Sequence, residues 1–335
     1  MDFTPTEEQR TLRELAVEIL DDLEGPELWK ALAAAGVLGG MAETGLLATV
    51  LVLEEAGRRT AGIPLAATYA YGIGPIAAHG SSEQRERLLP GLSDGSAVAT
   101  GAFPQRGGVT ADGRGRLTGT VPLVPWLREA AYVLVPTADR RCWLVRVEDA
   151  GVEPVETTAP WAAGRLTLDA TRAEPLGGEV TYADVLGRAR TAFAGLQAGV
   201  CAGSLARAVE HTAAREQFGR PLATLQAVQL RAADAHMDIE AIRVTTYEAA
   251  WRYDEGLPAE SHALTAAWWA SEAGTRAVHA GQHLHGGIGA DVEHPVHRHF
   301  LWGRQLDAYL GSAPELLAEL GQFLAQEERT AEVGA

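Results

Sequence analysis

The sequence predicts an α+β protein that is mostly α-helical, with a small β domain between two helical regions. Residues 1 to about 95 show helical apolar periodicity, and an alanine-rich helical pattern runs from about residue 181 almost to the C-terminus. Between them, short segments rich in Val, Leu and Tyr alternate with Gly, Pro and Asp. We therefore expect an N-terminal helical domain over 1–95, a reduced β-sheet domain over 96–180 and a C-terminal four-helix bundle over 181–335.

Capping and breaking residues delimit the helices of the first region. Thr4 or Thr6 can cap the first helix, whose opening turn carries Glu7 and Glu8 near the positive end of the helix dipole. The later helices are predicted from Pro26 to a stop at Gly36, from about Leu46 to Arg58, and from a Ser82 cap through Leu89 to a break at Pro90.

Four strands and three helix breaks are predicted in the rest of the chain. The strand patterns cover residues 116–121, 131–135, 142–147 and 165–168. The breaks fall near residues 219–221, 256–258 and 286–295, where Gly and Pro interrupt the helical pattern.

Composition argues against several classes of protein. The net charge of −16, with no basic patch, argues against a nucleic-acid partner. Two cysteines, Cys142 and Cys201, are too few for a disulfide framework and lack metal-ligand spacing. The N-terminus does not resemble a secretory signal, and no apolar run reaches the length of a membrane span. We expect a soluble, cytoplasmic protein without a membrane or nucleic-acid partner.

The most informative motif brings an arginine, an aromatic ring and an amide to one helix end. Residues 214–221 read Ala-Arg-Glu-Gln-Phe-Gly-Arg-Pro, and Gln226 follows Gly219 by seven residues. The planar guanidinium of Arg215, with its paired donors, suits a phosphate group. Alternatively, Arg215 is only a helix C-terminal cation before a glycine stop.

A second motif lies about sixty residues downstream, where residues 282–289 read Gln-His-Leu-His-Gly-Gly-Ile-Gly. Gly286, Gly287 and Gly289 allow backbone N–H groups to approach an anion closely. The alternative is a plain glycine turn between two helices. Four histidines lie around this turn: His285, His294, His297 and His299. They lack a compact helical ligand pair with carboxylate support, so we expect no metal site and interpret them as turn and interface residues.

Together, the two motifs and the order helix–strand–helix resemble the acyl-CoA dehydrogenase family over nearly the whole chain. The resemblance implies that Arg215 reaches across a subunit interface to the pyrophosphate of FAD. It also implies that Phe218 lies against the flavin and that Gln226 hydrogen-bonds it. Gly286, Gly287 and Gly289 match the second flavin contact of the family.

Two further positions follow from the resemblance. The family has a glutamine three residues before the first glycine of the second motif, and His283 stands there in this chain, still able to donate a hydrogen bond. Ser312 takes the place of the threonine in the family's Tyr-Glu-Gly-Thr turn, so it is also expected to contact the cofactor.

Both positions at which the family keeps its catalytic glutamate lack a carboxylate. The Tyr-Glu-Gly-Thr turn corresponds to residues 309–312, Tyr-Leu-Gly-Ser, which puts Leu310 at the base position. The other position precedes an arginine on the first helix of the C-terminal domain and is Ala189 before Arg190. Neither side chain accepts a proton, and Asp184 is too far upstream to replace them. We therefore expect no catalytic residue in this chain.

The β domain also lacks the polar segments with which the family lines the flavin. The corresponding regions are residues 100–108 and 119–126, where Pro122 and Pro125 remove backbone donors. These losses resemble the short, base-less subunits of actinobacterial heteromeric acyl-CoA dehydrogenases from steroid side-chain degradation. The resemblance implies FAD at a subunit interface, a full-length homologue as partner that supplies the glutamate, an acyl-CoA substrate and an electron-transfer flavoprotein-like acceptor.

Two other functions remain open. One is a non-enzymatic relative, a scaffold or acyl-CoA-binding protein without flavin; the Arg215, Phe218 and Gln226 combination argues against it. The other, a self-sufficient homomeric dehydrogenase, needs a base that only Glu255 could provide, and Glu255 is better explained as the end of a helix in solvent.

Overall fold

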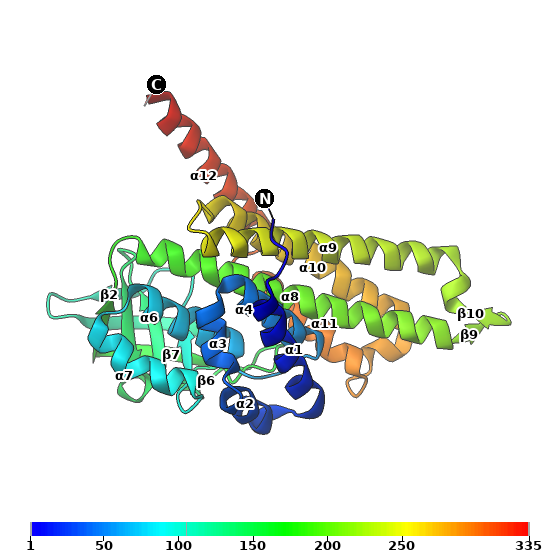
Figure 1. Ribbon diagram of the computed structural model, residues 1–335, viewed down its shortest axis with the longest axis horizontal. Coiled ribbons are helices and arrows are strands. Elements are labelled where there is room, and N and C mark those ends of the chain that lie inside the picture. The colour runs from blue at the N-terminus through cyan, green and yellow to red at the C-terminus, as the bar shows by residue number, and fades with distance from the viewer. Residues whose placement is uncertain (1, 105, 334–335) are drawn as a thin grey trace. The chain divides into compact units, whose positions relative to one another are not determined.

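The computed structural model describes residues 2–104 and 106–333, and it confirms an α+β fold that is mostly helical (Figure 1). The chain divides into two compact units. We call the first the sheet unit, Pro5–Val52 and Gly62–Ala189, and the second the bundle unit, Met1–Thr4, Leu53–Ala61 and Arg190–Ala335.

The sheet unit begins with short helices, two of which carry a capping box. Thr6, and not Thr4, caps the first of them: its side chain accepts the Gln9 N–H, and the Gln9 side chain accepts the Thr6 N–H. The helices are α1 (Glu7–Asp22), α2 (Gly25–Ala34), α3 (Val37–Thr44), α4 (Leu46–Arg58, of which the part from Leu53 belongs to the bundle unit), α5 (Leu65–Thr68), a π-helical turn (Tyr69–Ile73), α6 (Gly74–His79) and α7 (Ser82–Ser93).

The prediction for α7 was wrong at both ends. Ser81 is the N-cap, with Gln84 as its capping-box partner, so Ser82 is already helical. Pro90 lies inside the helix, which continues to Ser93. Proline removes one backbone hydrogen bond, but the helix survives because buried Leu88 and Leu92 anchor it on both sides of Pro90.

Two four-stranded sheets follow, and their strands include the four predicted segments. One sheet has the order β1-β4-β5-β8 and the other β2-β3-β7-β6; among the strands of the described residues, only β1 and β4 pair in parallel. The pairing of β3 with β7 is irregular between Val121 and Val124, around Pro122. The strands are β1 (Ala99–Gly101), β2 (Val109–Ala111), β3 (Arg116–Val124), β4 (Tyr132–Pro136), β5 (Cys142–Arg146), β6 (Gly151–Pro154), β7 (Gly164–Arg172) and β8 (Glu174–Leu176).

Long helices make up the bundle unit, and the predicted breaks separate them. A two-stranded hairpin with a 3₁₀ turn follows the first long helix, and a second 3₁₀ turn precedes the fourth. The elements are α8 (Thr181–Ala214, of which the part from Arg190 belongs here), β9 (Glu216–Gln217), β10 (Arg220–Pro221), η3 (Leu222–Thr224), α9 (Gln226–Asp254), α10 (Glu260–His285), η4 (Gly286–Ala290), α11 (Pro295–Tyr309) and α12 (Ala313–Val333).

Helix α8 is long and apolar enough to resemble a membrane span, but it is a core helix. Its most apolar window has a mean hydropathy of 1.2 and is 83% buried. Glycine lets its backbone touch the end of α4 inside the bundle unit. A Cβ at Gly199 would lie 1.9 Å from the Glu54 carbonyl oxygen, and one at Gly203 would lie 2.2 Å from that of Arg58. Any larger residue at these positions would push the two helices apart.

Candidate functional site

The two predicted motifs come together at one end of the bundle unit. Helix α8 ends just before Arg215, α9 begins at Gln226, and α10 ends at His285. His211, in the last turn of α8, stacks on His285 with ring centroids 4.8 Å apart. This contact joins the end of α8 to the end of α10, so the arginine motif and the glycine motif share one end of the bundle.

The loop between α8 and α9 presents its predicted cofactor residues to solvent. Arg215 is exposed and has no ion-pair partner among the described residues. Its backbone is fixed, because the Arg215 N–H donates to the His211 carbonyl at 2.8 Å and the Leu222 N–H donates to the Arg215 carbonyl at 2.9 Å. Gln226, the first residue of α9, is exposed as well.

Phe218 is the most unusual residue of this loop. Its side chain is 92% exposed, and its backbone has a φ of 55°, in the left-handed region that bulky residues seldom occupy. Such a conformation costs energy, and exposure of an aromatic ring gives none back. This combination is expected where another molecule covers the ring.

The glycine turn borders open space. A Cβ at Gly286 or Gly287 would meet nothing within 4 Å, so neither position is crowded. Gly286 has a φ of 64°, and this backbone conformation favours glycine there. His283 is exposed beside the turn. A cavity of about 450 Å³ opens here; its lining residues are His279, Gln282, His283, Gly286 and Phe300.

An exposed guanidinium and an open glycine turn at one end of the bundle fit a phosphorylated cofactor chemically. The guanidinium can bind phosphate oxygens in pairs, and the turn leaves room for close approach of a ligand. The direct contacts of Arg215, Phe218, Gln226, His283, Gly286 and Gly287 with a cofactor remain predictions.

Three of the four histidines around the turn, His285, His294 and His299, make hydrogen bonds within the protein, whereas Nδ1 of His297 is buried without a hydrogen-bond partner among the described residues. His285 is buried, and its Nδ1 donates to the Gly281 carbonyl at 2.7 Å. His294 lies edge-on to His285 and caps α11 by accepting the Val296 N–H at 3.3 Å. His299 contacts the Arg58 carbonyl through Nε2 at 3.0 Å. No group of three or more His, Cys, Asp or Glu in the described part of the chain is arranged to hold a metal ion.

The free energy of unfolding should fall when the pH drops from about 7.5 to about 5.5. Burial lowers the pKa of His285, and likewise that of His211, below the ordinary value of 6.5. The unfolded chain then binds protons that the folded chain excludes, so stability is complete above about pH 6.5 and is lost as the pH falls toward the folded-state pKa. Urea unfolding of His285→Gln should show a smaller pH difference; an unchanged difference would contradict this assignment.

Neither predicted base position holds a proton acceptor. Leu310 follows α11 and is buried, and its carbonyl lies 3.5 Å from the Arg190 guanidinium. Arg190 also pairs with Glu319 at 2.7 Å. Ala189 is completely buried within α8. The structure thus places inert side chains at both positions.

Ser312 has a structural role that the sequence analysis did not identify. Its backbone N–H and its hydroxyl both donate to the Glu315 carboxylate, at 2.9 and 3.0 Å, just before α12. Its contact with a cofactor remains a prediction. Glu255 is the exposed C-terminal cap of α9, with its N–H donating to the Trp251 carbonyl, as expected for a helix end in solvent.

Aromatic rings fill the part of the sheet unit in which the family's polar segments are missing. Phe103 is buried and stacks between Tyr71 and Tyr182, with centroids 5.3 and 5.5 Å away. Trp126 is buried as well and lies 5.1 Å from the ring of Trp161. Sequence reasoning missed these pairs because their members are far apart along the chain and follow no common motif.

Comparisons with known proteins place the chain in a family. Residues 6–96 match the N-terminal domain of acyl-CoA dehydrogenase, and residues 177–320 match its C-terminal domain. Acyl-CoA dehydrogenase FadE27 of Mycobacterium tuberculosis is 34% identical over 97% of this chain and 99% of its own length. FadE28 of the same organism is 30% identical over 96% and 98%. The chain belongs to the acyl-CoA dehydrogenase family, and this membership supports FAD as its cofactor.

Solved structures are similar to this chain over nearly its whole length. The steroid acyl-CoA dehydrogenase Tcur3481–Tcur3483, in a variant form, matches with 40% identity and a TM-score of 0.90 over 96% of this chain and 99% of that one. The ChsE4–ChsE5 complex from Mycobacterium tuberculosis matches with 32% identity and a TM-score of 0.90 over 97% and 99%. Butyryl-CoA dehydrogenase from Megasphaera elsdenii, at 23% identity and a TM-score of 0.87, shares the fold.

Proposed function

We propose that this chain is the base-less subunit of a heteromeric, FAD-dependent acyl-CoA dehydrogenase. A full-length homologue is its partner, and the pair desaturates an acyl-CoA thioester between the α- and β-carbons. The observation that carries the proposal is the pair of base positions, where buried Leu310 and buried Ala189 stand in place of a carboxylate.

The chemistry explains why a partner is needed. Desaturation requires a carboxylate that removes the α-proton. When bound, FAD accepts the hydride that leaves the β-carbon. This chain offers no carboxylate at either base position, so the proton passes to a glutamate of the partner chain.

The two regions of this chain that are expected to bind flavin by resemblance to the family also differ. Arg215 and Phe218 point into solvent at the end of the bundle unit, where they are free to complete a site on another chain. In the sheet unit, by contrast, the rings of Tyr71, Phe103 and Tyr182 occupy the region expected to line the flavin. Both features support a chain that completes the FAD site of its partner and houses no flavin of its own.

The relatives point to the class of substrate. The solved structure with 40% identity is a steroid acyl-CoA dehydrogenase, Tcur3481–Tcur3483. The one with 32% identity is a complex of two different chains, ChsE4 and ChsE5. We therefore propose a bulky acyl-CoA of the steroid side-chain type as substrate. An electron-transfer flavoprotein-like protein would accept the electrons, and the complex would work in the cytoplasm.

A non-enzymatic scaffold or acyl-CoA-binding protein is the second candidate function. The absence of a carboxylate at the two base positions is also expected for such a protein. However, it gives no reason for an exposed Phe218 at a φ of 55° beside an unpaired Arg215. Flavin content of the assembled protein separates the two candidates.

Purified alone, the chain should be colourless, whereas co-expression with a full-length homologue that carries the catalytic glutamate should yield a yellow complex. The reason is that its outward-facing cofactor residues need the partner's flavin site. Absorbance near 450 nm, measured against protein concentration, gives the flavin content, and a homologue with its own functional base that forms homomers serves as the control partner. Stoichiometric flavin in the isolated chain, or a colourless complex, would contradict the proposal.

A further inference from the structure

Three histidines form a cluster between the arginine motif and the glycine turn. The ring of His285 stacks on that of His211, with centroids 4.8 Å apart, and meets the ring of His294 edge-on at 4.9 Å. His285 is buried, and the other two are half-buried. We call these three rings the imidazole cluster. They come from the last turn of α8, the last turn of α10 and the residue before α11, so three helix ends meet there.

Backbone bonds connect the cluster to both cofactor motifs. The His211 carbonyl accepts the Arg215 N–H at 2.8 Å, so a shift of His211 moves the predicted phosphate-binding residue. His285 directly precedes Gly286 in the chain, and its Nδ1 donates to the Gly281 carbonyl at 2.7 Å. The contact between the two rings therefore fixes the position of Arg215 relative to the glycine turn.

The third ring, that of His294, caps α11 through an unprotonated nitrogen. Its Nδ1 accepts the Val296 N–H at 3.3 Å. A proton on Nδ1 would turn this acceptor into a donor, and it would place a positive charge at the positive end of the helix dipole. Neutral His294 thus stabilises the first turn of α11, and protonated His294 destabilises it.

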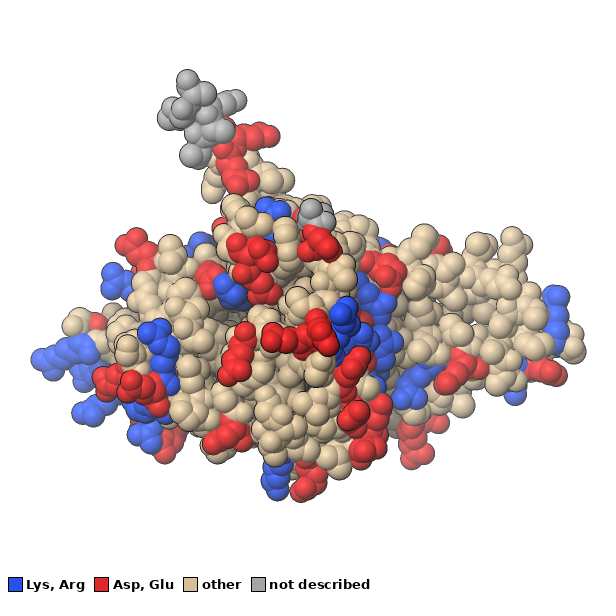
Figure 2. Space-filling model, viewed as in Figure 1, with Lys and Arg blue, Asp and Glu red and all other residues tan. Residues whose placement is uncertain are grey.

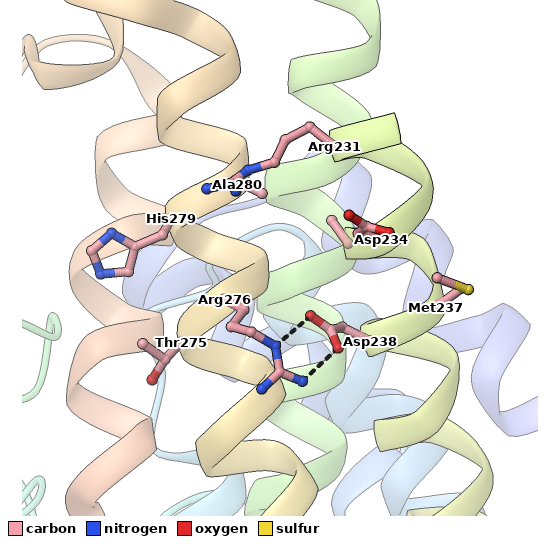
Figure 3. A pocket seen from close by; sticks show the side chains of 9 residues that line it. Arg231, Asp234, Met237, Asp238, Thr275, Arg276, His279 and Ala280 are labelled. Atoms are coloured by element: carbon pink, nitrogen blue, oxygen red, sulfur yellow. Dashed lines mark hydrogen bonds and ion pairs between the residues drawn. The ribbon is translucent and has the colours of Figure 1, made fainter. Parts of the chain in front are cut away.

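The charges on the elements around the cluster are mostly positive. On the face shown in Figure 2, the surface toward the β9–β10 end of the bundle unit carries few charged side chains. Arg231 extends from α9 toward α10 (Figure 3). The other charged residues are Arg207 and Glu210 on α8, Arg215 after it, Asp291 and Glu293 before α11, and Arg298 on α11. No ion pair joins these three carboxylates to a ring of the cluster in the described part of the chain.

Burial and the positive neighbours keep His211 and His285 neutral at pH 7. Burial lowers the pKa of His285 most, and the other two rings and Arg207 lower it further. Burial also lowers the pKa of His211, together with the ring of His294 and the charge of Arg215. On α11, burial lowers the pKa of His299 in the same way. A proton that enters the cluster therefore meets neighbours that repel it.

The rest of α10 is fixed independently of the cluster. The Arg276 guanidinium contacts the Asp238 carboxylate of α9 twice, at 2.6 and 3.0 Å (Figure 3). The ring of His279 lies edge-on to that of Phe300 on α11, with centroids 4.9 Å apart. Loss of the imidazole contacts should therefore displace the helix ends that carry the cofactor motifs and leave the body of the bundle unit in place.

We propose that the imidazole cluster is a proton-sensitive joint that positions the two cofactor motifs: it holds them together at neutral pH and separates them in mildly acidic solution. This inference rests on the proposed FAD-dependent function. Protonated rings repel one another, and protonated His294 no longer caps α11. Arg215 and the glycine turn then lose their common position, so the assembled complex releases FAD.

The test measures FAD binding by the assembled complex at about pH 7.5 and about pH 5.5, on either side of the ordinary histidine pKa of about 6.5. His294→Asn is the main variant, because asparagine caps helices well and takes up no proton in this range. The wild-type dissociation constant for FAD should rise about tenfold at the lower pH, the order of magnitude for one pH-linked imidazole. The same constant for His294→Asn should rise by no more than about threefold.

Two further variants separate the cap from the general effect of histidine. His294→Ala lacks the cap at either pH, so it should bind FAD more weakly already at pH 7.5 and lose little more at pH 5.5. His262→Gln is the matched control, because His262 lies in the first turn of α10, at the other end of the helix from the cluster. Burial lowers the pKa of His262 too, yet this variant should keep the wild-type response to pH.

Hydrogen exchange of the isolated chain gives a second measurement that needs no flavin. Protection of the Val296 N–H should fall at pH 5.5 in the wild-type chain and be kept in His294→Asn, once the intrinsic pH dependence of exchange is removed. Equal protection of the two chains at both pH values would overturn the role of His294.

The outcomes distinguish this inference from the proposed function. If the wild-type complex binds FAD equally well at both pH values, the joint is wrong and the proposed function stands. The same conclusion follows if His294→Asn loses as much affinity at pH 5.5 as the wild type and His262→Gln do. If the complex binds no FAD even at pH 7.5, the proposed function is overturned, and the control of FAD binding by the cluster falls with it.

Discussion

Replacing the glutamate that we propose the partner chain supplies with glutamine should lower turnover of the assembled complex by a factor of about 10²–10⁴, the usual contribution of a positioned general base. The reason lies in this chain's own residues. Leu310 and Ala189 occupy the two base positions and have no group that accepts a proton. With the partner's glutamate gone, no positioned carboxylate remains for the α-proton. Steady-state turnover, with flavin content measured on the same sample, gives the result.

The matched change in this chain is Glu255→Gln, which should leave turnover nearly unchanged. Glu255 is exposed at the C-terminal end of α9, away from either base position in the sequence. Glutamine keeps its size and removes only the charge, so the variant isolates the proton-accepting role. If Glu255→Gln abolishes turnover while flavin stays bound, this chain carries its own base, and the heteromeric proposal loses its main support.

How far the sequence predicted the fold depended on the local signal of each element. Glycine and proline breaks located the ends of the long bundle helices, since α8, α9 and α10 end close to predicted breaks. The segment over residues 65–79 carried no such signal: most of it is buried, so its apolar residues show no helical period. Pro90 was misread because burial of its neighbours, which the sequence does not display, kept the helix intact.

The candidate site was predictable only where a motif is continuous along the chain. Arg215 and the glycine turn were found as short motifs, and the structure brings them to one end of the bundle through the contact of His211 with His285. The stack of Phe103 between Tyr71 and Tyr182 joins three distant segments, and no short motif announces it.

Arg215→Ala should weaken FAD retention in the assembled complex by about 2–5 kcal/mol, the range for removing one partner of a buried charged pair at an interface. In the isolated chain Arg215 is exposed and unpaired, so its loss should not affect folding. In the complex, a phosphate left without its guanidinium would stay buried and uncompensated. Equilibrium dialysis of the complex against a flavin-free buffer, followed by absorbance, measures the loss.

The control is Arg220→Ala, which removes the same charge from the same loop between α8 and α9 and should change retention by about 1 kcal/mol at most, as for an exposed ion pair. Arg215→Lys should fall between the two, because a point charge replaces the charge but not the planar pair of donors. The loss of FAD retention should therefore increase in the order Arg220→Ala, Arg215→Lys, Arg215→Ala, and this order separates the effect of the charge from that of the guanidinium geometry. If Arg215→Ala and Arg220→Ala retain flavin equally, the phosphate contact is wrong, and Arg215 is only the cation that ends α8.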